Sequence, residues 1–546
     1  MSSIYDKSSL VLILSGTKAG KVYSQKPVSG DGDFTFTRSS AATRVNADGN
    51  IEKETGNLLT YSNDFSNSGW LKLNGSAVVG KTATDPFGVS NNAWVVTFNG
   101  SANGRIEQAL TAFTGVKAAS IWVRTQSGTQ DVRIGLTGVN LRTYTANTTW
   151  QRIEHFSSNE YPRINCEDAA TLEIFGFQCE YGLVARDYIE TTTSAVYGGI
   201  TDNVPRLDYS GGATCPSFLL EPQRSNLMVQ SEAFSTTAWT NNAIDTNVTA
   251  NATTSPEGLQ NAAEIEFTSS SAKIFDQFTN VASSMHIGSV WLKNKDIGSI
   301  RVRIEGGAPN ILGRVDVNLA NGTLSNAVGD FTPTIEDYGD GWYRVAVGDT
   351  GTATIATPSF NLDYLSSTGS FYAYGAQVEA GTYATSYIPT FGSSVTRVVE
   401  AAVKTLGASY FPTNGISVFV DFDVTHSSVT NFSDLYTLTG SSAQLRLETR
   451  TFGRIYIQQG NMVTSGDNFN AYNLCPSTAK KICLTFSSTQ VKAYVDGVLI
   501  NTWNGSYTWD FTDLNMAMQG STAAYNNTML FPSTLSNQEA IDLTTL

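Results

Sequence analysis

The sequence predicts an all-β protein made of tandem antiparallel β-sandwich (jelly-roll) domains, preceded by an extended N-terminal segment. Charged residues make up only 15% of the chain, and it contains 47 glycines, which is typical of turn-rich β structure with an uncharged polar surface. Apolar residues come in short alternating runs, such as 119–124 and 301–305, separated by Gly and Asn clusters. Long amphipathic helical patterns are nearly absent. At about 150 residues per domain, the length corresponds to three or four units.

Part of the chain is repeated. Residues 57–70 align without gaps on residues 226–239, at an offset of 239 − 70 = 169. The same offset carries Trp122 onto Trp291. Because one register holds over so long a stretch, the two copies are expected to form the same structural unit.

The two copies differ in length. Trp150 matches Trp342 at an offset of 342 − 150 = 192, so the second copy has a net insertion of 192 − 169 = 23 residues, roughly 318–341. A Gly- and Pro-containing stretch separates the copies, which marks it as a connector. The predicted regions are an attachment and assembly segment at 1–50, module 1 at 51–195, the connector at 196–218, module 2 at 219–395, and a third unit at 396–546.

The third unit has the clearest strand patterns of the chain. Residues 491–500 alternate around Asp496-Gly497, a strong signal for a two-residue type I′ turn, and therefore predict a β-hairpin. Near the end of the chain, Ser536 is a candidate N-cap for a short helical turn.

Charge and cysteine content exclude several classes of partner. The 48 acidic and 34 basic side chains give a net charge of −14, which would repel nucleic acid and anionic membrane surfaces. The apolar stretch at 10–14 is too short for a signal-peptide core or a membrane span, so membrane insertion is not expected. The cysteines share no CxxC spacing and are expected to be reduced core thiols: Cys166, Cys179, Cys215, Cys475 and Cys483.

The repeated segments resemble a known class of module. Residues 120–124 and 150–152 recur as residues 289–293 and 342–344. This pair of motifs resembles the carbohydrate-binding-module sandwiches that are attached to glycoside hydrolases. The resemblance implies a β-sandwich that contacts sugar.

Other segments resemble lectin-like and virion proteins. Residues 491–501 and 535–540 are similar to parts of a laminin-G or concanavalin-like jelly roll. The connecting segments resemble those of bacteriophage head-fibre, decoration and tail-fibre proteins, and this resemblance covers nearly the whole chain. The segments concerned are residues 9–13, 34–46, 205–209, 219–227 and 387–390.

Aromatic and basic side chains alternate on the repeated strands and are the candidate carbohydrate-binding residues. Residues two apart share a strand face, and an aromatic ring on an open face can stack on a sugar while a cation bonds its hydroxyls. Packing between the two sheets, with Arg stems passing the rings, is the open alternative. The candidates are Trp122, Arg124, Trp150, Trp291, Lys293, Trp342 and Arg344.

No catalytic residues are assigned, and the chain is not expected to be an enzyme. The histidines, His155, His286 and His426, have no partner at a recognisable triad or metal spacing. Glu180 and Glu379 recur in both copies, which favours an architectural role over the paired acids of glycoside hydrolysis. No cofactor is certain. A structural calcium ion stays an open alternative because Asp and Asn oxygens abound.

The resemblances imply two alternative functions. The leading one is a structural protein of a bacteriophage virion (head fibre, capsid decoration or tail fibre) that projects lectin-like domains for attachment to the host or to cell-surface glycans. Residues 1–50 would then bind other virion proteins, the chain would form homo-oligomers, with trimers favoured by analogy with fibres, and it would be made in the host cytoplasm and lie on the virion surface. The alternative is a free or enzyme-associated carbohydrate-binding protein.

Overall fold

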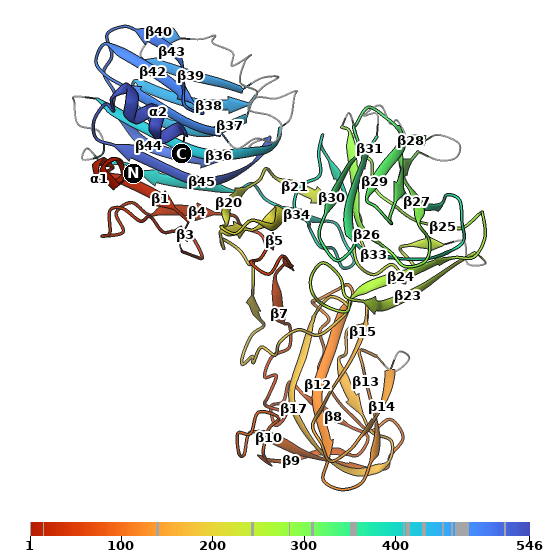
Figure 1. Cartoon of the computed structure of the whole chain (residues 1–546). Helices are drawn as coiled ribbons and strands as arrows, with labels where there is room; N and C mark the ends of the chain where they lie inside the picture. The colour runs from red at the N-terminus through yellow and green to blue at the C-terminus, as the bar shows by residue number, and fades with distance from the viewer. Residues whose placement is uncertain are drawn as a thin grey trace.

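The computed structural model shows three β-sandwiches that meet near the centre of the molecule (Figure 1). It describes residues 2–545 except 15, 138–140, 242–244, 283, 307–310, 350–356, 408–409, 411–414, 428–432, 450–452, 460–461, 465–479 and 518–519. Its named helical elements are α1 (Ser2–Lys7), α2 (Asn537–Thr545) and the 3₁₀ turn η1 (Ser210–Gly212). The predicted all-β fold class with tandem sandwiches is confirmed.

Module 1 is a sandwich of two antiparallel sheets with a shared apolar core. The first sheet consists, in spatial order, of β15 (Gln151–Ser157), β12 (Lys117–Thr125), β17 (Ala169–Tyr181), β10 (Ala93–Asn99) and β9 (Ser76–Ala83). The second consists of β14 (Leu141–Ala146), β13 (Gln130–Gly135), β16 (Arg163–Asn165), β11 (Arg105–Glu107) and β8 (Leu71–Leu73).

Module 2 repeats this plan with one additional strand in each sheet. The first sheet consists of β23 (Thr246–Thr253), β24 (Ala262–Phe267), β33 (Gly369–Ala380), β26 (His286–Asn294), β31 (Trp342–Gly348) and β30 (Thr334–Asp337). The second consists of β22 (Thr240–Asn241), β25 (Lys273–Gln277), β32 (Ser359–Tyr364), β27 (Ser299–Glu305), β28 (Ile311–Asn318) and β29 (Thr323–Val328). The 23-residue insertion supplies β29 and β30, each of which lies at the edge of its sheet.

The long strand of each module is bulged at the same place. The pairing of β12 with β17 and of β26 with β33 shifts register next to Trp122 and Trp291. Gly176 and Gly375 lie there with φ of 61° and 63°, a backbone conformation that favours glycine. A Cβ on Gly375 would also lie 2.8 Å from the ring of Trp291. Glycine is therefore needed for the conformation and, in module 2, for the packing.

The third sandwich combines strands from both ends of the chain with strands from the connector (Figure 1). One sheet consists of β19 (Arg206–Asp208), β20 (Ser217–Leu220), β45 (Ser521–Phe531), β36 (Ile416–Ser427), β41 (Lys480–Phe486), β42 (Gln490–Val495) and β43 (Val498–Asn504), with β1 (Leu10–Ile13) also on β45. The other consists of β2 (Thr17–Lys18), β3 (Lys21–Val22), β4 (Phe34–Thr37), β35 (Ala401–Thr405), β44 (Phe511–Ala517), β37 (Ser433–Gly440), β38 (Ala443–Thr449), β39 (Gly453–Gln459) and β40 (Met462–Thr464). Short pairs join β5 (Arg44–Val45) to β6 (Ile51–Glu52), β7 (Thr55–Asn57) to β18 (Val196–Gly198), and β21 (Arg224–Asn226) to β34 (Val395–Arg397).

The N-terminal residues, predicted as an extended segment, contribute strands to the third sandwich. Leu10 pairs with Leu530, and Phe36 pairs with Ala402. Phe34 and Phe36 are buried while the threonines between and after them are exposed, so these strands need an apolar core on one side. Residues 10–37 therefore contain strands of the third sandwich, with partners that are hundreds of residues away in the sequence.

Two local predictions in the third unit are confirmed. Asp496 and Gly497 have φ of 47° and 82° between β42 and β43, as a type I′ turn requires at both positions. The Ser536 hydroxyl accepts a hydrogen bond from the Glu539 amide at 3.3 Å, and the Glu539 carboxylate accepts one from the Ser536 amide at 2.9 Å. Together they form a capping box before α2.

The cysteines follow the prediction only in part. Cys166, Cys179 and Cys483 are buried, and burial raises the pKa of the Cys179 thiol to about 12. Cys215 is exposed, because it lies in the turn between β19 and β20 rather than in a strand, so the prediction of a core thiol is wrong there. Cys475 lies outside the described residues.

A buried cluster of charged side chains joins the third sandwich to the connector and to the start of module 2. The side chains of Arg38, Arg206, Arg397, Glu221 and Glu400 are at most 2% exposed. Glu221 accepts 2.8 Å contacts from Arg206 and Arg397, and Glu400 accepts one from Arg38. Burial alone would raise the pKa of Glu221, but Arg397 and Arg206 hold it well below its usual range. Because these groups come from distant parts of the sequence, the cluster fixes where those parts meet.

Candidate functional site

In module 1, the predicted tryptophans belong to a half-open aromatic cluster. Trp122 on β12 is half-buried, and its ring centroid lies 5.9 Å from Phe175, 5.7 Å from Tyr188 and 5.7 Å from Phe87. Phe87 is 67% exposed. Together with the half-buried Trp150, these residues form what we call the module 1 aromatic face: Phe87, Trp122, Trp150, Phe175 and Tyr188.

Polar groups are held in place beside these rings. The Arg124 guanidinium lies 4.8 Å from the Trp150 ring centroid and donates a 2.6 Å hydrogen bond to Glu173. The Trp150 indole donates to the Thr84 carbonyl at 3.2 Å. Arg124 and Trp150, both predicted as site residues, are therefore brought together with Trp122, and their geometry is fixed by bonds to neighbouring strands and loops.

In module 2, the equivalent residues are covered. Trp291 is 1% exposed, Trp342 is 3% exposed and Arg344 is 6% exposed. Lys293 is half-buried, with its ammonium 5.9 Å from the Trp342 ring centroid. Burial to this degree leaves no ring surface for a sugar to stack on. The prediction of sugar contact is thereby corrected for Trp291, Trp342 and Arg344.

The cover over module 2 comes from outside the repeated motif. Tyr338, which belongs to the insertion, contacts Trp291 edge-on at 5.5 Å. Ile51, at the predicted start of module 1, joins the same buried apolar cluster as Trp291 and Trp342. The Ile51 amide donates a 2.8 Å hydrogen bond to the Pro256 carbonyl. The chain thus fills, in module 2, the face that it leaves accessible at Phe87 in module 1.

Charged side chains hold the segment that contains Ile51 in place over module 2. Lys53 lies 2.5 Å from Glu232 and 3.0 Å from Glu257, and its side chain is 2% exposed. Arg186 of module 1 donates a 2.9 Å hydrogen bond to Glu257. Burial opposes ionisation of Glu257, but Lys53 and Arg186 hold its pKa below the usual range.

Neither acid of this arrangement is present in module 1. Glu232 aligns with Asn63. The loop of Glu257 has the same hydrogen bonds as the loop of Phe87, since Gly258 donates to Ser255 as Gly88 does to Asp85. Glu257 therefore occupies the position that Phe87 holds in module 1. As a result, the module 1 aromatic face lacks the acids that bind Lys53 in module 2.

Other repeated residues are architectural. The Arg152 guanidinium donates to the Ser120 hydroxyl at 3.0 Å and to a backbone carbonyl at 2.6 Å, and Arg344 repeats both bonds with Ser289 and a backbone carbonyl. Glu180 and Glu379 each accept a 2.8 Å hydrogen bond from a backbone amide six residues further on. In both modules these groups hold the closing loop against the sheet, as predicted for the two glutamates.

His286 forms a buried pair with Asp349 that was not visible in the sequence. Its Nδ1 lies 2.7 Å from the carboxylate, and its Nε2 accepts a 3.0 Å hydrogen bond from the Val281 amide. Both ring nitrogens are thus occupied, which leaves none to activate a nucleophile. His155 lies beside Phe156, and the side chain of His426 lies outside the described residues.

The described residues contain neither a metal-type cluster nor a helix that could span a membrane. No group of three or more His, Cys, Asp or Glu side chains in this part of the chain is arranged to hold a metal ion. No helix in it is long and apolar enough to cross a bilayer.

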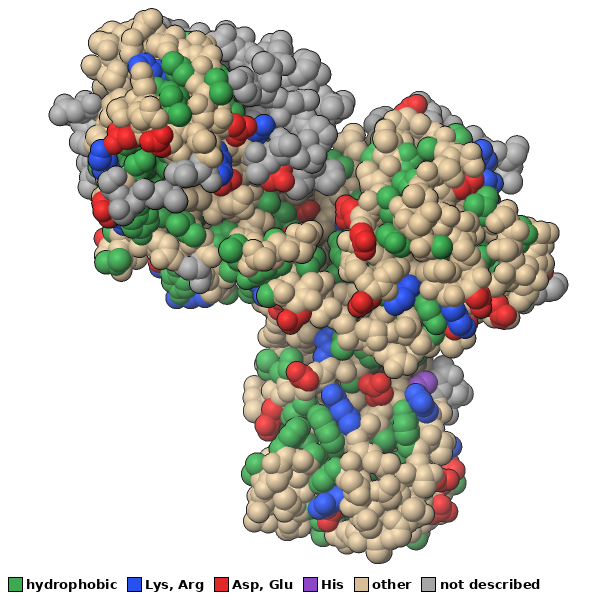
Figure 2. Space-filling model, in the orientation of Figure 1, with side chains coloured by type: hydrophobic (Ala, Val, Ile, Leu, Met, Phe, Trp, Pro, Cys, Tyr) green, Lys and Arg blue, Asp and Glu red, His purple; other side chains and the backbone are tan. Residues whose placement is uncertain are grey.

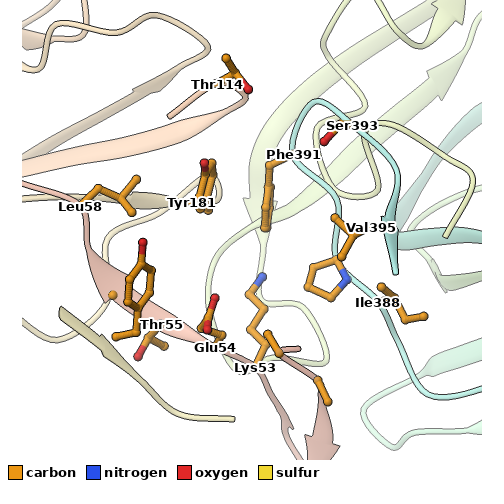
Figure 3. A pocket seen from close by; sticks show the side chains of 15 residues that line it. Lys53, Glu54, Thr55, Leu58, Thr114, Tyr181, Ile388, Phe391, Ser393 and Val395 are labelled. Carbon is orange, nitrogen blue, oxygen red and sulfur yellow. The ribbon is translucent and has the colours of Figure 1, made fainter. Parts of the chain in front are cut away.

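A pocket of about 280 Å³ lies where module 1, the connector and the end of module 2 meet (Figure 3). The rings of Tyr181 and Phe391 stack there at 5.9 Å, with an interplanar angle of 11°. Lys53 and Glu54, near the predicted start of module 1, point toward these rings (Figure 3). Burial, followed by the charge of Asp202, raises the pKa of Glu54 to about 7. Sequence reasoning missed this pocket, because its walls come from segments without a common motif.

Comparison with known proteins identifies no family. No protein-family model matches the chain, and no curated protein matches its sequence. Among solved structures, it is similar to the binding domain of botulinum neurotoxin serotype D, with 12% identity over 26% of this chain and 39% of that one and a TM-score of 0.22. The match therefore spans less than half the length of that domain.

Two further solved structures, both of carbohydrate-binding modules, are similar to parts of this chain. The tandem CBM22 domains of Paenibacillus barcinonensis Xyn10C share 13% identity over 59% of this chain and 97% of that one, with a TM-score of 0.22. The CBM40 of the Ruminococcus gnavus IT-sialidase, bound to α2,3-sialyllactose, shares 13% identity over 24% of this chain and 83% of that one, with a TM-score of 0.19. At these TM-scores the similarities assign neither fold nor function, and the fold rests on the strand pairings described above.

Proposed function

We propose that this protein is a non-enzymatic glycan-binding protein of a bacteriophage particle, a head fibre, capsid decoration or tail fibre, and that module 1 contacts the glycan. One observation carries the proposal: the aromatic face that module 2 covers with Ile51 and Tyr338 reaches the surface in module 1 at Phe87, which is 67% exposed. Figure 2 shows hydrophobic side chains on the surface of module 1.

The chemistry of the face suits an uncharged glycan. Aromatic rings stack on the C–H surface of a sugar ring. Beside them, the paired Arg124 and Glu173 offer hydrogen-bond donors and acceptors whose positions are already fixed, which lowers the entropy cost of binding. The pair is neutral as a whole, so it favours hydroxyls over a charged sugar.

The virion role is supported by the resemblance of the connecting segments to phage fibre and decoration proteins. Three of those segments supply Arg38, Arg206 and Glu221 to the buried charge cluster, so they have a definite structural task in this chain. The protein would lie on the virion surface. The test is immunogold electron microscopy of particles with antibodies to residues 396–546. Bare particles beside abundant soluble antigen would instead support a free carbohydrate-binding protein.

The glycan proposal is tested by screening the full chain on a glycan array and measuring affinity for the best ligand by calorimetry. Phe87→Ser should weaken binding about tenfold, which corresponds to ~1.4 kcal/mol. The matched control is Val28→Ser, because Val28 is 96% exposed in a loop of the third sandwich and its loss should leave affinity unchanged. Unchanged binding by Phe87→Ser, or no glycan bound at all, would contradict the proposal.

A further inference from the structure

The junction pocket has the composition of a binding site that is separate from the module 1 aromatic face. Tyr181 belongs to module 1, Tyr197 to the connector, and Phe391 to the end of module 2. Tyr197 is 46% exposed, so the pocket has an aromatic rim that solvent reaches. Clefts between domains, with apolar walls and a few placed polar groups, are where small ligands bind most often.

We propose that the junction pocket binds a single uncharged hexose unit that carries a methyl group, as an N-acetyl or a 6-deoxy sugar does. A volume of about 280 Å³ lies just below the ~300–1,000 Å³ of typical ligand pockets, so one sugar unit fits better than a chain. This proposal does not depend on glycan binding at Phe87.

The side chains that line the pocket explain why it would recognise both a methyl group and the hydroxyls of a sugar ring. Leu58, Ile388 and Val395 offer apolar contacts for a methyl group, and Thr55, Thr114 and Ser393 offer hydroxyls for the ring. The Tyr181 and Phe391 rings, stacked on each other, add aromatic surface for the C–H groups of a sugar.

An anionic sugar is disfavoured by the charges around the pocket. The Lys53 ammonium lies 5.3 Å from the Phe391 ring centroid but is already bound by Glu232 and Glu257. A carboxylate in the pocket would therefore meet Glu54 and the nearby Asp202 without an unengaged Lys53 to balance it.

Glu54 makes the affinity dependent on pH. It faces Asp202, which opposes its ionisation, and Arg38, which favours it, and it interacts with Tyr181 and Tyr197. A bound sugar would exclude water from Glu54 and so favour the protonated carboxyl further. Because its pKa is about 7, the pocket binds best below pH 7 and loses affinity as the pH rises through 7.

The test uses saturation-transfer NMR of the full chain with methyl glycosides of N-acetylglucosamine, fucose and sialic acid at pH 6 and pH 8. The first two should bind at pH 6 and weaken about threefold or more at pH 8, and sialic acid should bind less well than either. Glu54→Gln, which stays neutral, should keep the pH 6 affinity and lose the pH dependence. Tyr197→Ala should weaken binding of both neutral sugars.

Phe87→Ser separates this proposal from the one for module 1. Because Glu54 lines the junction pocket, the variant should still bind these monosaccharides more tightly at pH 6 than at pH 8, and its loss of binding to larger glycans tests only the module 1 aromatic face. The junction-pocket proposal is overturned if no monosaccharide binds, if Phe87→Ser abolishes their binding, if sialic acid binds best, or if Glu54→Gln keeps the pH dependence of the wild type.

Discussion

The two modules contain the same motif in two different environments. Trp122 and Trp291 sit next to the same bulge and carry the same arginine above the ring, at 4.4 Å from Arg152 and 4.6 Å from Arg344. Trp122 is nevertheless half-buried, whereas Trp291 is 1% exposed. A repeated motif therefore specifies its own internal bonds without specifying whether its outer surface stays open to solvent.

The difference comes from a few residues outside the motif. Module 2 has Glu257 where module 1 has Phe87, and Glu232 where module 1 has Asn63. The two acids hold Lys53, and through it the segment that lays Ile51 over the tryptophans. One copy of the duplicated module thus packs against its neighbour, and the other retains a surface for an external ligand.

The largest expected effect is the loss of stability when Trp291 or Trp122 is replaced by alanine. Trp291→Ala should destabilise module 2 by about 4 kcal/mol, as large-to-small changes of a buried Trp do, whereas Trp122→Ala should cost module 1 about half as much because the ring is only half-buried. Hydrogen exchange measured peptide by peptide separates the modules, which a single unfolding curve of a multidomain chain does not. If the two variants lose protection from hydrogen exchange equally in their own modules, Trp122 and Trp291 are not buried to different extents.

The second effect concerns the salt bridges of Lys53. Lys53→Met leaves Glu232 and Glu257 buried without that cation and should cost about 3 kcal/mol, seen as faster hydrogen exchange in residues 50–57 and 255–259. Adding Glu232→Asn and Glu257→Phe, the residues of module 1, should restore more than half of the lost protection. If the triple variant is no more protected than Lys53→Met, the acids do not explain the difference between the modules.

The smallest expected effect is a pH-dependent change in stability, caused by one side chain in the core of module 2. Asp276, in β25, pairs with Phe360, as Ile106 pairs with Ile164 in module 1. In both modules, the backbone amide two residues after this position donates a hydrogen bond to a proline carbonyl. Asp276 thus holds the position of a core isoleucine. Burial raises its pKa to about 7, although a hydrogen bond from Gln277 opposes the rise.

The sign of the pH effect follows from that raised pKa. The folded state favours protonated Asp276, so its contribution to stability is complete below the unfolded pKa near 4 and is lost as the pH rises through 7. Asp276→Asn should therefore match the wild type at pH 4 and be more stable by ~2 kcal/mol at pH 8, measured as the melting temperature at each pH. If the melting temperatures of Asp276→Asn and the wild type differ by the same amount at both pH values, the Asp276 carboxyl does not titrate as expected.

Local features of the fold were predictable because neighbouring residues decide them. The Asp496-Gly497 turn and the Ser536 cap need only a few adjacent residues, and the repeat at one register predicted two copies of one sandwich. The architectural role of Glu180 and Glu379 could also be predicted, since both recur with the backbone amides that they bind.

Strand content, the duplication and the local turns thus follow from the order of residues along the chain, whereas the covering of each face depends on contacts between distant segments. Alternation shows that Phe34 and Phe36 need a core, but not that β35 and the rest of the third sandwich supply it. Alternation likewise does not show that Ile51 covers Trp291, or that distant segments form the junction pocket. The physical reason is that burial depends on side chains that approach in space, whereas periodicity reports only that a side chain needs a partner.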